Sequence, residues 1–162
     1  MKVNPWARRQ SRRVLVQALY QWQMGGAETG AVRKEFLESG SLKKGDREFF
    51  TEIFSGAAAR IDRDGNGSVA EAEQLDTLFA PLLDRKVSEL DQVERAILRL
   101  GTFELAHRID VPYRVVLDEY VELAKTFGAE DSHKYINAIL DGLAKQLRTI
   151  ETNHDAASKQ SS

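Results

Sequence analysis

Four arginines stand close together near the start of the chain, as two adjacent pairs. Arg8, Arg9, Arg12 and Arg13 recur four residues apart, so in a helix they would share one flank. This arrangement is locally unfavourable, because the start of a helix prefers anions and the cations repel one another. An anionic partner would offset that cost, since guanidinium groups and free helix N–H groups bind phosphate and arginine stacks on exposed bases. The alternative is a solvated face with salt bridges to acids elsewhere in the fold.

The charge of the chain is distributed unevenly. Residues 1–27 carry five basic side chains and no acidic one, although the formal net charge of the whole chain is -2. A basic N-terminal segment on an otherwise acidic chain indicates contact with a polyanion at one place rather than general attraction to anions.

A second polar segment, FGAEDSHKYINAIL, joins two expected helices late in the chain. It places Asp131, Ser132, Lys134 and Tyr135 within one helical turn of each other. Polar donors beside an aromatic ring suit single-stranded RNA, because splayed bases stack while their edges seek hydrogen bonds. The alternative is structural, with Asp131 or Ser132 capping a helix and Tyr135 packed inward.

Residues 62–73, DRDGNGSVAEAE, match every fixed position of an EF-hand calcium loop. Five residues would supply oxygen atoms to the ion: Asp62, Asp64, Asn66, Ser68 and Glu73. A tight polar turn between two helices would use the same residue types, because connectors are rich in Asp, Asn and Gly. Calcium binding and a simple turn therefore both remain open.

Several classes of function lack the residues that they need. The chain has no cysteine, which excludes disulfides, thiolate nucleophiles and thiolate-bound metals. Its three histidines show no metal-binding pair and no serine nucleophile beside them, and no glycine-rich phosphate loop is present. We therefore expect that this protein is not an enzyme. The absence of a long apolar run and of a secretory signal predicts a cytoplasmic protein that makes no contact with a membrane.

The elements that must position these residues are helices. Apolar residues recur with helical spacing in nearly every long stretch, and none alternates as a strand does. The pattern predicts an all-α fold of about seven helices in one domain, residues 1–150. The helix around residues 89–108 is apolar on more than one side and should be central. Pro81 should bend or break its helix, and residues 151–162 should form a disordered tail.

Three long segments carry a family resemblance. ARRQSRRVLVQALYQWQ, ELDQVERAILRLGTFEL and VPYRVVLDEYVELAKTFGAEDSHKYINAILDGL resemble, in order and spacing, the bacterial transcription antitermination factor NusB family. The resemblance implies two small helical bundles packed together, at about residues 5–65 and 71–150. It also implies binding of the boxA sequence in nascent ribosomal RNA jointly with NusE, a small-subunit ribosomal protein, in support of RNA polymerase.

The resemblance also assigns roles to individual residues. It places Arg8 and Arg9 in an arginine-rich RNA motif with Arg12 alongside, and Glu94 at an acidic position that faces NusE. The second RNA-contact region would comprise Asp131, Ser132, Lys134 and Tyr135. The family usually has phenylalanine at the last of these positions, and a tyrosine keeps the stacking face.

The EF-hand-like loop departs from the family pattern, because it forms an additional segment between two family helices. The main hypothesis is therefore an RNA-binding antitermination factor that requires no cofactor, with a possible Ca²⁺ ion at the added loop. The alternative is a calcium-binding helical regulator, although EF-hands usually occur in pairs. A recognition module like that of some ribosomal RNA methyltransferases is less favoured, because no catalytic domain follows.

Overall fold

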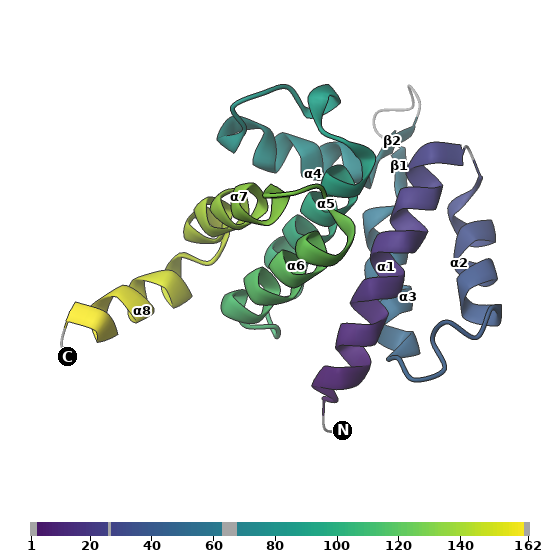
Figure 1. Cartoon of the computed structure of the whole chain (residues 1–162), viewed down its shortest axis with the longest axis horizontal. Coiled ribbons are helices and arrows are strands. Elements are labelled where there is room, and N and C mark those ends of the chain that lie inside the picture. The colour runs from purple at the N-terminus through teal and green to yellow at the C-terminus, as the bar shows by residue number, and fades with distance from the viewer. Residues whose placement is uncertain (1–2, 26, 63–67, 161–162) are drawn as a thin grey trace.

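The computed structural model describes residues 3–25, 27–62 and 68–160 (Figure 1). Within these residues it contains eight α-helices, two short 3-10 helices and one two-stranded ribbon, which confirms the all-α class. The elements are α1 (Pro5–Gly25), α2 (Thr29–Glu38), α3 (Arg47–Ala57), β1 (Arg60–Asp62), β2 (Ser68–Ala70), α4 (Glu71–Phe79), η1 (Ala80–Leu82), η2 (Val87–Glu89), α5 (Gln92–His107), α6 (Tyr113–Phe127), α7 (Ser132–Leu147) and α8 (Thr149–Gln160).

Helix α5 lies at the centre of the molecule. It packs against α1 and α3 on one side and against α4, α6 and α7 on the other (Figure 1). Its apolar residues on several faces require this position, and Ala96, Ile97, Leu98 and Leu100 are completely buried. The prediction of a central helix in this segment is therefore confirmed. None of the helices in the described part of the chain is both long and apolar enough to cross a membrane.

Local sequence sets the ends of the helices that matter for the site. The side chain of Asn4 accepts hydrogen bonds from the backbone N–H groups of Trp6 (3.1 Å) and Ala7 (3.2 Å), which caps the start of α1. At the other predicted boundary, α4 ends at Phe79 and the chain continues as a 3-10 turn containing Pro81. The predicted break at this proline is confirmed.

The segment predicted to be a disordered tail is instead a helix through Gln160, so that prediction is wrong for residues 151–160; residues 161–162 lie outside the described part. Polar contacts hold α8 against the start of α6. Asp155 accepts hydrogen bonds from the Tyr113 hydroxyl and the Arg114 Nε, both at 2.7 Å. Glu151 accepts one from the Tyr113 backbone N–H at 3.1 Å. The prediction failed because residues 151–160 lack apolar periodicity, and polar side chains anchor this helix instead.

Candidate functional site

The four arginines of α1 separate by burial. The side chains of Arg8 and Arg12 are only 15% and 2% exposed, whereas that of Arg9 is 53% exposed and Arg13 is also exposed. Residues 8 and 12 share a helix face that turns toward the core, and residues 9 and 13 share the neighbouring face that turns outward. The arginine run therefore provides two outward cations rather than four.

Arg12 is part of the core. Its Nε and Nη2 donate to the two carboxylate oxygens of Glu104, each at 2.9 Å, and the Tyr120 hydroxyl donates to the same carboxylate at 2.5 Å. Burial lowers the pKa of Arg12, but the hydrogen bonds and charge of Glu104 outweigh it and the net pKa is raised. Burial and the charge of Glu104 raise the pKa of Tyr120. The side chain of Arg12 is 2% exposed, so its guanidinium has little surface for RNA in this structure, and its RNA contact stays a prediction.

Arg8 also turns inward. Its guanidinium lies 4.6 Å from the centre of the Phe49 ring, and its nitrogens lie 3.8 Å from the carboxylates of Asp46 and Asp110. This environment balances the charge of Arg8 within the fold, so only the small exposed part of the side chain could meet a ligand. The alternative of salt bridges to acids elsewhere thus describes Arg8 well.

Arg9 lies on the surface and is oriented by an acid from α6. Its Nη2 donates to Glu119 at 2.9 Å, and its Nε lies 3.2 and 3.3 Å from the two oxygens of the same carboxylate. The hydrogen bond and charge of Glu119 raise the pKa of Arg9. A phosphate at Arg9 would compete with Glu119 for a guanidinium that already points outward.

Arg13 connects the arginine helix to the second polar segment. Its guanidinium lies 5.5 Å from the centre of the Phe127 ring. Phe127 is the last residue of α6, and the turn that leads to the second polar segment follows directly. The structure therefore brings the two predicted segments into one neighbourhood, although more than a hundred residues separate Arg13 from Phe127 in sequence.

The turn before α7 is shaped by Gly128 and Asp131. A Cβ atom at Gly128 would lie 2.2 Å from the Ser132 hydroxyl oxygen, so no other residue fits there without displacement. Asp131 adopts a left-handed backbone conformation (φ 66°) and forms an exposed ion pair with Lys134 at 3.4 Å instead of capping α7 with its side chain. Ser132 is 6% exposed, so little of its surface is available to RNA in this structure, and its RNA contact stays a prediction.

Tyr135 is half-buried, and a cation covers its ring. The ring packs against the hydrophobic core, and the guanidinium of Arg85 lies 4.5 Å from its centre. Burial raises the pKa of the Tyr135 hydroxyl, and the charge of Asp84 adds to this against the opposing effect of Arg85. A base that approached here would meet the guanidinium plane before the ring. Sequence reasoning missed Arg85, because nothing in its local pattern indicates the contact.

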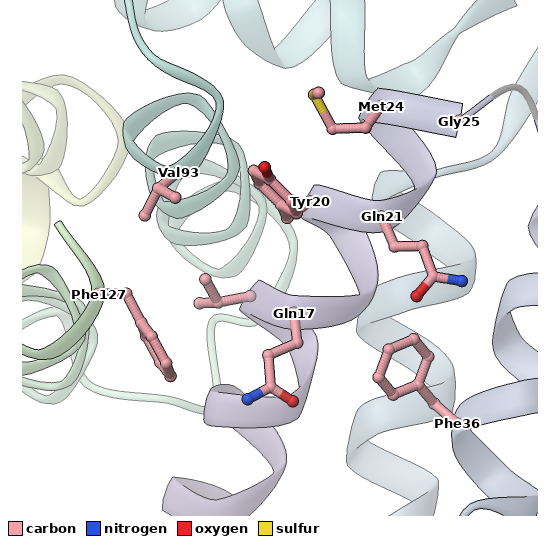
Figure 2. Close-up of a pocket in the computed structure, with 9 residues that line it drawn as sticks. Gln17, Tyr20, Gln21, Met24, Gly25, Phe36, Val93 and Phe127 are labelled. Atoms are coloured by element: carbon pink, nitrogen blue, oxygen red, sulfur yellow. The ribbon is translucent and has the colours of Figure 1, made fainter.

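An open apolar groove of about 480 Å³ lies along the later part of α1. It includes Phe127, the residue that Arg13 contacts. Val93 and Phe127 lie on one side of α1 in Figure 2, and Phe36 lies on the other. Two of its lining residues, Tyr20 and Met24, are 40% and 57% exposed. Phe127 thus contributes both to this groove and to the contact with Arg13.

Glu94, predicted to face a protein partner, follows Val93 of the groove and is half-buried. Burial, together with the Asp91 carboxylate beside it, raises the pKa of Glu94 to about 7. The charge of Glu94, in the first turn of α5, therefore changes near neutral pH.

The predicted calcium loop is described only in part. Asp64 and Asn66 lie outside the described residues. Asp62 and Ser68 are register partners in the antiparallel ribbon, and Glu73 lies exposed in the first turn of α4. Within the described residues there is no group of three or more His, Cys, Asp or Glu side chains that could hold a metal ion. Calcium binding by this loop stays a prediction.

Comparisons with known proteins agree with this architecture. The NusB family model matches residues 9–145. A transcription antitermination protein NusB from Alcanivorax borkumensis is 50% identical over 150 residues, which cover 93% of each chain. The protein of the same name from Pectobacterium carotovorum is 46% identical over 146 residues, 90% of this chain and 97% of the relative. The solved structure of T. maritima NusB superposes with a TM-score of 0.69 at 28% identity, covering 90% of this chain and 93% of that one. This chain therefore belongs to the NusB family of transcription antitermination proteins.

Proposed function

We propose that this protein binds boxA of nascent ribosomal RNA together with NusE and so supports processive transcription by RNA polymerase. The observation that carries the proposal is the contact between Arg13 and Phe127. It brings together the cationic stripe, which consists of the exposed Arg9 and Arg13, the second polar segment and the apolar groove. The proposal assigns no catalysis and no required cofactor to the chain, and it places the protein in the cytoplasm, where nascent RNA is made.

The RNA would follow the exposed cations. Four exposed side chains would supply phosphate contacts. Two of them, Arg9 and Arg13, lie on α1, and the other two are Lys134 and Arg85. Arginine also stacks on bases, so the Arg85 guanidinium over Tyr135 offers a planar surface to an unpaired base. Phosphate contacts would position the strand, and contacts with base edges near Asp131 would contribute selectivity.

The apolar groove would receive NusE. Exposed apolar area rimmed by polar residues is typical of protein interfaces, and Tyr20 and Met24 present such area without any partner in the described chain. NusE bound at the groove would lie beside Phe127 and hence beside the RNA path. A joint surface of this kind explains how a chain of net negative charge binds RNA selectively.

The proposal is tested by fluorescence anisotropy of a labelled boxA RNA titrated with the protein, with and without NusE, against an RNA of scrambled sequence. We expect selective binding that tightens when NusE is present. Equal affinity for both RNAs under every condition would contradict the proposal. Repeating the titration in calcium and in chelator also tests whether the loop at residues 62–73 binds the ion and affects RNA binding.

Met24→Glu should weaken NusE binding by at least about 30-fold, because it places a charge in the apolar groove. Met24 is 57% exposed, so the substitution should leave the stability of the protein unchanged. Ile150→Glu is the matched control, since Ile150 is an exposed apolar residue on α8, outside the groove. Calorimetric titration with NusE measures the effect. Wild-type affinity in the Met24 variant would exclude the groove as the NusE site.

A further inference from the structure

Trp6 is an exposed aromatic residue at the start of the arginine helix. Its side chain is 75% exposed, whereas the other tryptophan of the chain, Trp22, is partly buried against the core. The cap by Asn4 fixes the backbone of Trp6 in the first turn of α1, so the ring projects from an ordered helix rather than from a loose end. Most of this large apolar side chain therefore meets solvent and is not packed in the core.

The position of Trp6 continues the cationic stripe. Trp6, Arg9 and Arg13 follow each other at intervals of three and four residues, which places them on one face of α1. The guanidinium of Arg9 lies 5.1 Å from the centre of the Trp6 ring, and Glu119 holds that guanidinium in place. One side of the indole is therefore supported by a fixed cation, while most of its surface meets solvent.

We propose that Trp6 is a base-stacking residue that extends the RNA path beyond the arginines. An exposed ring supported by an arginine is the arrangement on which single-stranded nucleic acid stacks, and stacking accepts any base because every base has a π-face. This inference rests on the proposed function and adds to it one nucleotide contact at the start of α1.

The charges around Trp6 favour RNA over a protein partner. The groove assigned to NusE lies at the opposite end of α1, and Trp6 and Met24 are separated by about 27 Å along the helix. Near Trp6 the exposed residues of the stripe are arginines, which a phosphate backbone complements. Trp6, Arg9 and Arg13 are not among the residues that line the groove, which the stripe meets only at Phe127.

The test compares Trp6→Leu and Trp6→Phe with wild type in anisotropy titrations with boxA RNA, and records tryptophan emission during the same titrations. Trp6→Leu should weaken RNA binding by about 5- to 150-fold, and Trp6→Phe should retain most of the affinity because it keeps a ring. RNA should quench tryptophan emission in wild type but not in Trp6→Phe, where Trp22 is the remaining tryptophan. Ile150→Ala is the matched control for loss of an exposed apolar side chain.

The outcomes separate this inference from the proposed function. If wild type binds boxA selectively and Trp6→Leu binds equally well, the role of Trp6 is overturned and the proposed function stands. If wild type shows no selective binding, the proposed function fails, and the role of Trp6 fails with it. A loss of affinity for NusE in Trp6→Leu, with RNA affinity intact, would reassign the ring to a protein contact and also overturn the inference.

Discussion

Glu104→Ala should lower the free energy of unfolding by about 3–5 kcal/mol, because it leaves the buried guanidinium of Arg12 without its carboxylate. Glu104 is completely buried, and it accepts two hydrogen bonds from Arg12 and one from the Tyr120 hydroxyl. The substitution therefore strands a charge and a hydroxyl in the core, between α1, α5 and α6. Urea unfolding followed by circular dichroism measures the change.

Two further variants separate the stranded charge from ordinary loss of packing. Glu122→Ala removes an exposed ion pair with Lys125 on α6 and should change stability by no more than about 0.5 kcal/mol. Replacing the group together, by Arg12→Met, Glu104→Leu and Tyr120→Phe, should recover much of the stability that Glu104→Ala loses. A loss below about 1 kcal/mol in Glu104→Ala would show that the buried charge finds another partner.

Arg148→Met should destabilise the protein by at least about 3 kcal/mol, because the methionine removes the hydrogen bonds that Arg148 donates to four backbone carbonyls in a buried site. Arg148 is 4% exposed and donates to the backbone carbonyls of Leu105 (2.8 Å), Arg108 (2.8 Å), Val111 (2.9 Å) and Glu104 (3.1 Å). These carbonyls belong to the last turn of α5 and the loop that follows. Thermal and urea unfolding measure the loss.

The same variant should loosen α8. Arg148 donates to Glu151 at 2.5 Å, and Glu151 also accepts a hydrogen bond from the start of α6. Amide exchange in residues 149–160 should therefore become faster in Arg148→Met than in wild type. Lys145→Ala, an exposed substitution on α7, is the control and should alter neither stability nor exchange. Unchanged stability in Arg148→Met would contradict the role of the side chain as a cap of α5.

The sequence predicted the helices well because apolar periodicity reports directly which face of a helix is buried. It could not predict which arginines would face outward. Arg8, Arg9, Arg12 and Arg13 carry the same charge at adjacent positions, and only the packing of α1 on α3 and α5 decides their burial. A buried arginine needs a partner distant in sequence, and nothing near Glu104 marks it as that partner.

The second polar segment shows the same limit. Its residues were predicted as one contact region, yet Ser132 is buried under the turn and Tyr135 lies beneath Arg85. Both outcomes depend on long-range packing that local composition does not encode. The link between Arg13 and Phe127, which brings the two segments together, likewise depends on how α1 and α6 pack.

The central claim is that Arg9 and Arg13 contact RNA phosphates while the inward arginines stabilise the fold. The most direct test is the salt dependence of boxA binding in the Arg9→Ala, Arg13→Ala double variant. Removing two phosphate contacts from a single-stranded RNA should reduce the slope of log K against log salt by about 1.4. Arg114→Ala, which removes another exposed arginine at the start of α6, should leave the slope unchanged. An unchanged slope in the double variant would contradict the claim.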